Sequence, residues 1–132
     1  MNQYDEVESK KIRINYNFII AGGMCGLFTI ILGAFGAHVL KNTIQNMPAY
    51  QTAVQYQSFH SLALILLGVI MFQLNNKYLK WAGIFYIIGI ILFCGSLYLL
   101  SMTKILTFAL ITPVGGVAFL LGWVSFLLGL RK

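Results

Sequence analysis

Few side chains in this sequence could carry out acid–base or ligand chemistry. Two histidines, His38 and His60, lie within or at the end of long apolar runs, whereas the three carboxylates, at positions 5, 6 and 8, precede the first run. Residues 9–132 therefore contain no Asp or Glu. Carboxylate acid–base pairs, carboxylate-bound metal pairs and acidic proton relays all need such residues. The sequence excludes these chemistries for the apolar part of the chain.

Histidine chemistry without carboxylates is also limited. Two histidines with no Asp, Glu or nearby Cys form an incomplete coordination shell, so we predict no metal site and no cofactor. Haem needs only two axial histidines, but the spacing does not show that His38 and His60 face each other. A hydrolase using Ser58, Ser61 or Ser96 would lack an orienting acid and a nucleophile turn. The sequence favours a protein that is not an enzyme; an enzyme or a haem carrier is the third hypothesis.

The composition is that of a membrane protein. Of the 132 residues, 59% are hydrophobic and 9% charged, and the mean hydropathy is +0.83. A soluble domain has about 25% charged residues. The net charge of +6 comes from nine basic residues that form no patch with interleaved aromatic residues, so we expect no nucleic-acid partner. We predict a multi-pass protein of the cell membrane, plasma or inner, whose partner is the lipid bilayer.

Four charge-free runs set the architecture, at residues 14–40, 42–76, 81–103 and 105–130. Each can supply the roughly 20 apolar residues that cross a bilayer, and helices satisfy their own backbone in lipid. The predicted fold is all-α, a four-helix transmembrane bundle. We place a polar cytoplasmic tail at 1–16 and one transmembrane domain at 17–132, with helices near 17–40, 48–74, 79–101 and 105–130.

The basic residues predict the orientation. The tail, the middle loop and the C-terminus carry Lys10, Lys11, Arg13, Lys77, Lys80, Arg131 and Lys132. The two opposite loops carry only Lys41 and Lys104. Because cytoplasmic loops are enriched in Lys and Arg, we expect both termini to be cytoplasmic.

Small residues recur at helical spacing in three of the four runs. The first run has Gly22, Gly26, Thr29, Gly33 and Gly36; the third has Ala82, Gly89, Ser96 and Thr103; the fourth has Gly115, Ala118, Gly122, Ser125 and Gly129. Such stripes let helices approach closely in lipid. We predict that they are packing faces, used within the chain or in a homo-oligomer or a complex with another membrane protein. The alternative is that glycine is merely frequent in membrane helices.

Polar residues from every predicted helix fall in the same leaflet. With the termini inside, the outer half of the bundle contains His38, Gln57, His60, Ser96, Tyr98 and Thr112. Intramembrane polar and ionisable groups are costly, so we predict a polar pocket there. Pro113 should kink the fourth helix and free a carbonyl, for which Thr112 could be the partner. The alternative is that both histidines have structural or interfacial roles.

Four motifs resemble a known family in order and spacing. They are GAFGAH at 33–38, TAVQYQSFHSLAL at 52–64, GIFYIIGIILFCGSLYLL at 83–100 and ITPVGGVAFLLGW at 111–123. Together they resemble the YgdD/YwdK-like domain-of-unknown-function family of small membrane proteins. The resemblance implies four spans and no assigned activity, and it supplies no catalytic residues. The shared site it suggests comprises His38, Gln55, Tyr56, His60, Gly95, Ser96, Tyr98, Thr112, Pro113, Gly115 and Gly116.

Two main functional hypotheses follow. The first is a non-catalytic protein that acts by packing with itself or a larger complex and so supports membrane or envelope integrity. The second is a binder or conduit for a small molecule, lipid or ion that uses the polar cluster around His38 and His60. Four helices are too few for an inverted-repeat transporter, so a conduit would need an oligomer.

Overall fold

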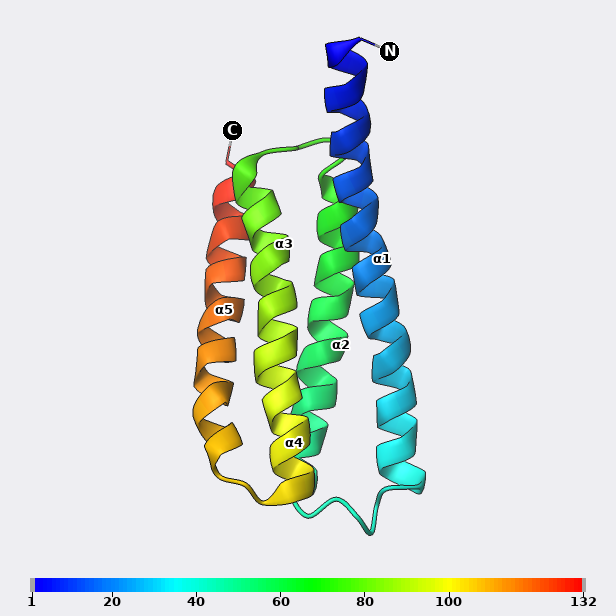
Figure 1. The fold of residues 1–132 in the computed structure, drawn as a ribbon, viewed down its shortest axis with the longest axis vertical. Helices are drawn as coiled ribbons and strands as arrows, with labels where there is room; N and C mark the ends of the chain where they lie inside the picture. Colours follow the sequence, from blue (N-terminus) through cyan, green and yellow to red (C-terminus); the bar gives the residue numbers. More distant parts are fainter. Residues whose placement is uncertain (1, 132) are drawn as a thin grey trace.

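Long helices run side by side along the whole molecule (Figure 1). The computed structural model describes residues 2–131. Helix α1 spans Gln3–His38, α2 spans Met47–Ile70 and α5 spans Thr107–Gly129. The third rod is continuous over Lys77–Thr103 and consists of α3 (Lys77–Gly89), the π-helical turn η1 (Ile90–Cys94) and α4 (Gly95–Thr103).

The predicted four-span fold is confirmed. Within residues 2–131, four helices are long and apolar enough to cross a membrane. Both chain ends lie at the same end of the bundle (Figure 1); we call the opposite end, which carries the loops at 39–46 and 104–106, the distal end. That the termini face the cytoplasm stays a prediction.

The boundary expected near residue 17 is not a helix boundary. Helix α1 begins at Gln3, and its first turns project beyond the other helices (Figure 1). Asn2 and Asp5 form a reciprocal capping box, and Asp5 and Glu6 place negative charge at the positive end of the helix dipole. The polar tail is therefore a continuation of the first helix. Helix α2 ends at Ile70, earlier than the expected position near 74.

The bundle is closed along some seams and open along another. Helix α1 packs along α2, α3 and η1 pack on α5, and α2 packs against η1 and α4. One core cluster includes Leu64, Leu67, Leu79 and Tyr86, and a second joins Ala53, Cys94, Leu97 and Phe119. Helices α2 and α5 form no comparable contact along their length. A crevice therefore lies between them.

Most of the predicted packing glycines lie on the closed seams. A Cβ atom would come within 3.0 Å of a neighbouring helix at Gly22, Gly36, Gly89, Gly115, Gly122 and Gly129. At Gly26 and Gly33 the nearest side-chain atoms would be 3.6 Å away, an ordinary contact. The stripes of α1 and α5 thus face α2 and α3–η1 of the same chain.

Candidate functional site

The first polar contact in the bundle links three helices. The Tyr98 hydroxyl of α4 donates to Gln57 Oε1 of α2 at 2.7 Å, and Gln57 Nε2 donates to the Cys25 carbonyl of α1 at 3.1 Å. Gln57 is 6% exposed. Each end of its amide therefore has a partner inside the chain, and the amide acts as a cross-link between helices.

The second contact fixes the protonation state of His60. The indole N–H of Trp123 in α5 donates to His60 Nε2 at 3.1 Å, so that nitrogen carries no proton. The other nitrogen, Nδ1, lies 2.8 Å from the Tyr56 carbonyl and must be the donor there. His60 is 2% exposed and stacks on Phe119 with a centroid distance of 3.6 Å. The ring is neutral, and both of its nitrogens are used.

The third contact joins α4 to α5. Ser96 Oγ and Thr112 Oγ1 are 2.7 Å apart, and each hydroxyl also lies within hydrogen-bond distance of a carbonyl in its own helix. Pro113 lies within the helix that spans Thr107–Gly129. Because Pro113 has no N–H, the Ala109 carbonyl lacks its usual helical donor. Thr112 bonds to Phe108 rather than to Ala109.

His38 lies apart from these contacts. It is the last residue of α1 and is exposed. Gly36 of α1 packs on Tyr50, and His60 is ten residues further along α2, which corresponds to about 15 Å. The structure therefore joins Gln57 to Tyr98 and Ser96 to Thr112, and it seats His60 against Trp123. It does not bring His38 and His60 together within one chain.

The crevice between α2 and α5 lies beside this network. Its volume is about 640 Å³. Its lining includes the aromatic side chains of Tyr56, Phe59, Phe93, Phe119 and Trp123 together with His60, and of these His60 and Phe119 are buried. Gln55 and Pro113 mark its distal part. Gln55 is exposed and forms none of the side-chain hydrogen bonds found among residues 2–131.

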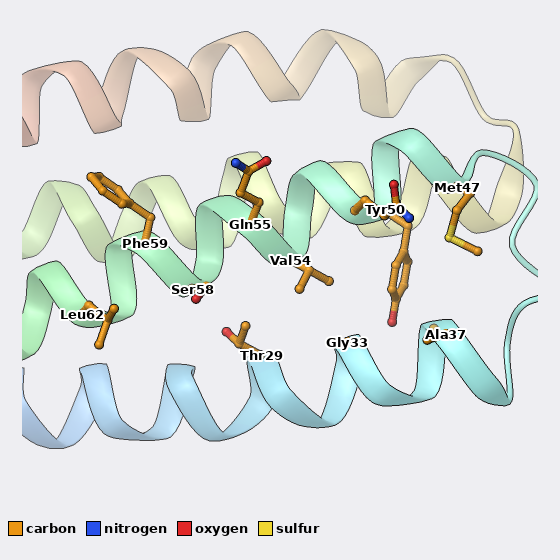
Figure 2. Close-up of a pocket in the computed structure, with 12 residues that line it drawn as sticks. Thr29, Gly33, Ala37, Met47, Tyr50, Val54, Gln55, Ser58, Phe59 and Leu62 are labelled. Carbon is orange, nitrogen blue, oxygen red and sulfur yellow. The ribbon is translucent and has the colours of Figure 1, made fainter.

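A second groove lies between α1 and α2 (Figure 2). Thr29 and Ser58 face each other across it, and Tyr50 points from α2 toward α1. The Tyr50 hydroxyl donates to the Leu32 carbonyl at 2.6 Å. The groove has a volume of about 540 Å³. Gln55 borders both hollows, and Figure 2 shows its amide directed away from α1.

Sequence reasoning missed the residues that complete the site. Trp123 and Phe119 were not among the predicted pocket residues, although Trp123 donates a hydrogen bond to His60 and Phe119 stacks on its ring. The motif ITPVGGVAFLLGW contains both, but no local signal relates position 123 to position 60. Gln55 was named only through the family resemblance. Its exposed position on a helix beside a crevice is visible only in three dimensions.

Comparison with known proteins places this architecture in a family. The family described as "Protein of unknown function (DUF423)" matches residues 32–116, from the distal end of α1 to the tenth residue of α5. The chain belongs to this family. The matched range contains both histidines, Gln55, Gln57 and Pro113, so the DUF423 region includes the distal part of the crevice.

Individual relatives agree on the membrane assignment. The inner membrane protein YgdD of Escherichia coli K12, named as UPF0382, is 42% identical over 113 residues, which cover 84% of this chain and 86% of the relative. The UPF0382 membrane protein SH2409 of Staphylococcus haemolyticus is 38% identical over 117 residues, covering 87% and 95%. No solved structure matches this DUF423 chain significantly. The protein is a multi-pass membrane protein of an uncharacterised family.

Proposed function

We propose that this protein is a non-catalytic membrane protein that binds a small molecule from the bilayer in the crevice between α2 and α5. The observation that supports this proposal is the crevice itself. Its volume of about 640 Å³ falls within the roughly 300–1,000 Å³ of ligand pockets. Apolar walls with a few polar groups are typical of such sites, and Gln55 is a polar side chain with no hydrogen-bond partner among residues 2–131.

The state of the internal polar groups supports a non-catalytic role. Acid–base catalysis requires a side chain that can take or give a proton at the substrate. His60 borders the crevice, but both of its nitrogens are bound inside the protein. The amide of Gln57 is likewise used at both ends. These groups favour a rigid wall beside a bound molecule over a reacting centre.

Filling the crevice tests the proposal. At Gly116 a Cβ would meet only the Phe93 ring, at 3.8 Å, so Gly116→Leu can occupy the crevice without forcing helices apart. Gly23→Leu is the matched control, because a Cβ there meets nothing within 4 Å and lies outside the crevice. Native mass spectrometry of protein extracted from cell membranes should show retained small-molecule adducts. The adducts should be lost in Gly116→Leu and kept in Gly23→Leu; equal adducts in both variants would contradict the proposal.

The groove between α1 and α2 favours a second function, association with another copy or another membrane protein that supports membrane or envelope integrity. Small and polar residues drive helix association in lipid. This groove offers Gly33, Thr29 and Ser58, with the exposed Gln51 at its border (Figure 2). Most of the tight glycine positions face helices of the same chain, whereas Gly33 in this groove has only an ordinary contact at 3.6 Å, so the groove is one surface open to a partner.

Disulfide trapping tests this second function. In a background with Cys25 and Cys94 replaced by Ala, Gln51→Cys should form a cross-linked dimer in membranes if α2 faces a second copy. Leu127→Cys, on the exposed face of α5, is the control and should stay monomeric. A Gln51→Cys protein that cross-links no more than the control would remove self-association through this groove.

A further inference from the structure

We infer that the crevice between α2 and α5 selects an uncharged lipid with a hydroxyl-bearing head group, of the monoacylglycerol class, and that Gln55 hydrogen-bonds that head group. This inference rests on the proposed function, because it assigns the ligand class of the same crevice.

The depth of Gln55 favours a lipid with a small head group. Gln55 is eight residues beyond Met47, where α2 begins, which is about 12 Å from the distal end of the helix. Helix α5 has 23 residues, or about 34 Å, which is close to the thickness of the hydrocarbon core. Gln55 therefore lies below the level of the phospholipid head groups. Only a lipid whose polar end can enter the hydrocarbon layer can reach it.

The charge of the crevice excludes an ionic head group at that depth. Among the residues of 2–131 that line it, none is acidic or basic apart from His60, and the two hydrogen bonds of His60 hold it neutral. A phosphate or an ammonium group would have no counter-charge there, and an unpaired charge is costly in hydrocarbon. An uncharged polar group avoids this cost.

The hydrogen-bonding groups favour a ligand that can donate. Gln55 offers an N–H donor and a carbonyl acceptor, and an unpaired amide in hydrocarbon is itself unfavourable. Hydroxyl groups can pair with both ends of this amide, because they both donate and accept. An ester alone could only accept.

The rest of the crevice suits an acyl chain. From Pro113 to Trp123 its wall follows ten residues of α5, about 15 Å. The side chains along this length include Phe93, Phe119 and Leu120, and the Trp123 ring lies at the proximal end. A chain that starts with its head group at Gln55 would therefore pass the aromatic rings and reach Trp123.

Trp123 makes the inference directly testable. The chain has two tryptophans, and Trp81 lies on α3 outside the crevice, so Trp81→Phe leaves Trp123 as the single reporter. The protein is reconstituted in phosphatidylcholine nanodiscs and titrated with a monoacylglycerol that carries a dibrominated chain, because bromine quenches tryptophan on contact. Dibrominated phosphatidylcholine and phosphatidylglycerol are the comparison probes. Monoacylglycerol should quench Trp123 saturably, and its mole fraction at half-maximal quenching should be about three- to tenfold lower than that of either phospholipid. One or two hydrogen bonds in lipid would give a preference of this size.

Two variants separate the inference from the proposed function. In Gln55→Leu, the mole fraction of monoacylglycerol that gives half-maximal quenching should rise to that of phosphatidylcholine. Gln51 is an exposed glutamine outside the crevice, so Gln51→Leu should leave the preference for monoacylglycerol unchanged. Saturable quenching that Gly116→Leu abolishes, but that shows no preference for monoacylglycerol or none that depends on Gln55, would overturn the ligand class and leave the binding function standing. Quenching by no probe, or quenching unaffected by Gly116→Leu, would overturn both.

Discussion

Helix α5 packs tightly against the third rod on one side and borders the open crevice toward α2 on the other. Toward η1 it presents Gly115, where a Cβ would lie 2.7 Å from the Phe93 Cα atom, so the two backbones nearly touch. Toward α2 it presents Gly116, where a Cβ would meet only the Phe93 ring at 3.8 Å. Two adjacent glycines thus belong to a closed seam and to an open crevice. The frequency of glycine alone therefore does not show whether a glycine lies in a tight helix contact or lines an open crevice.

The glutamines of α2 repeat the contrast. Gln57 points into the bundle and bonds to Tyr98 and to the Cys25 carbonyl, whereas Gln55 lies exposed beside the crevice. In hydrocarbon, polar groups inside a bundle stabilise it only when they are paired. The pairing of Gln57 stabilises the fold, whereas Gln55, which has no hydrogen-bond partner among residues 2–131, is the residue that we propose contacts a ligand.

The largest effect should come from adding volume to the closed seam. Gly115→Val would force α5 away from the Phe93 backbone, and overpacking of this kind costs about 1–3 kcal/mol or more. Gly116→Val should leave the free energy of unfolding nearly unchanged. Unfolding titrations with sodium dodecyl sulfate in mixed micelles measure both. Equal losses of stability in the two variants would mean that the seam and the crevice do not differ as described.

Removing the buried amide should have the next largest effect. Gln57→Leu leaves the Tyr98 hydroxyl without its acceptor and removes one donor from the Cys25 carbonyl, which keeps the Thr29 hydroxyl at 2.8 Å. We expect a loss of about 1–2 kcal/mol. Gln55→Leu replaces an exposed amide by an apolar group and should keep or slightly raise stability. The same micelle titration compares the two. A destabilised Gln55→Leu would show that Gln55 has a partner inside the fold.

The sequence predicts the spans well because long apolar runs in lipid have few alternatives to helix. It also places Gln57 and Tyr98 at similar depth, but depth along a helix does not show which side chains meet. It does not predict the π-helical turn at Ile90–Cys94, because one extra residue in a turn changes neither composition nor hydropathy. That turn rotates the residues after it. Contacts that depend on this rotation are therefore visible only in the structure. The separation of His38 from His60 has another cause, the distance of about 15 Å along α2 between Tyr50, which packs on Gly36, and His60.

A smaller effect is expected at the pair formed by His60 and Trp123. Trp123→Phe removes the donor to His60 Nε2 and should cost about 0.6 kcal/mol, near the average for hydrogen bonds inside membrane proteins. A double-mutant cycle with His60→Phe isolates the coupling from the loss of ring contacts. The cycle should give a positive coupling energy. Two strictly additive single effects would show that the hydrogen bond contributes nothing to the crevice wall.

The smallest effect should come from the one tyrosine hydroxyl that is buried without a partner among residues 2–131. Tyr86 is 1% exposed, and its hydroxyl has no hydrogen bond, unlike that of Tyr98. Removing an unpaired buried hydroxyl leaves the ring contacts in place and relieves a desolvation cost, so Tyr86→Phe should leave stability unchanged or slightly increased. Tyr98→Phe, the same chemical change on a paired hydroxyl, should reduce stability. If Tyr86→Phe lowered the free energy of unfolding more than Tyr98→Phe does, the Tyr86 hydroxyl would have to bond to a bound water or another partner. The packing around Tyr86 would then include water.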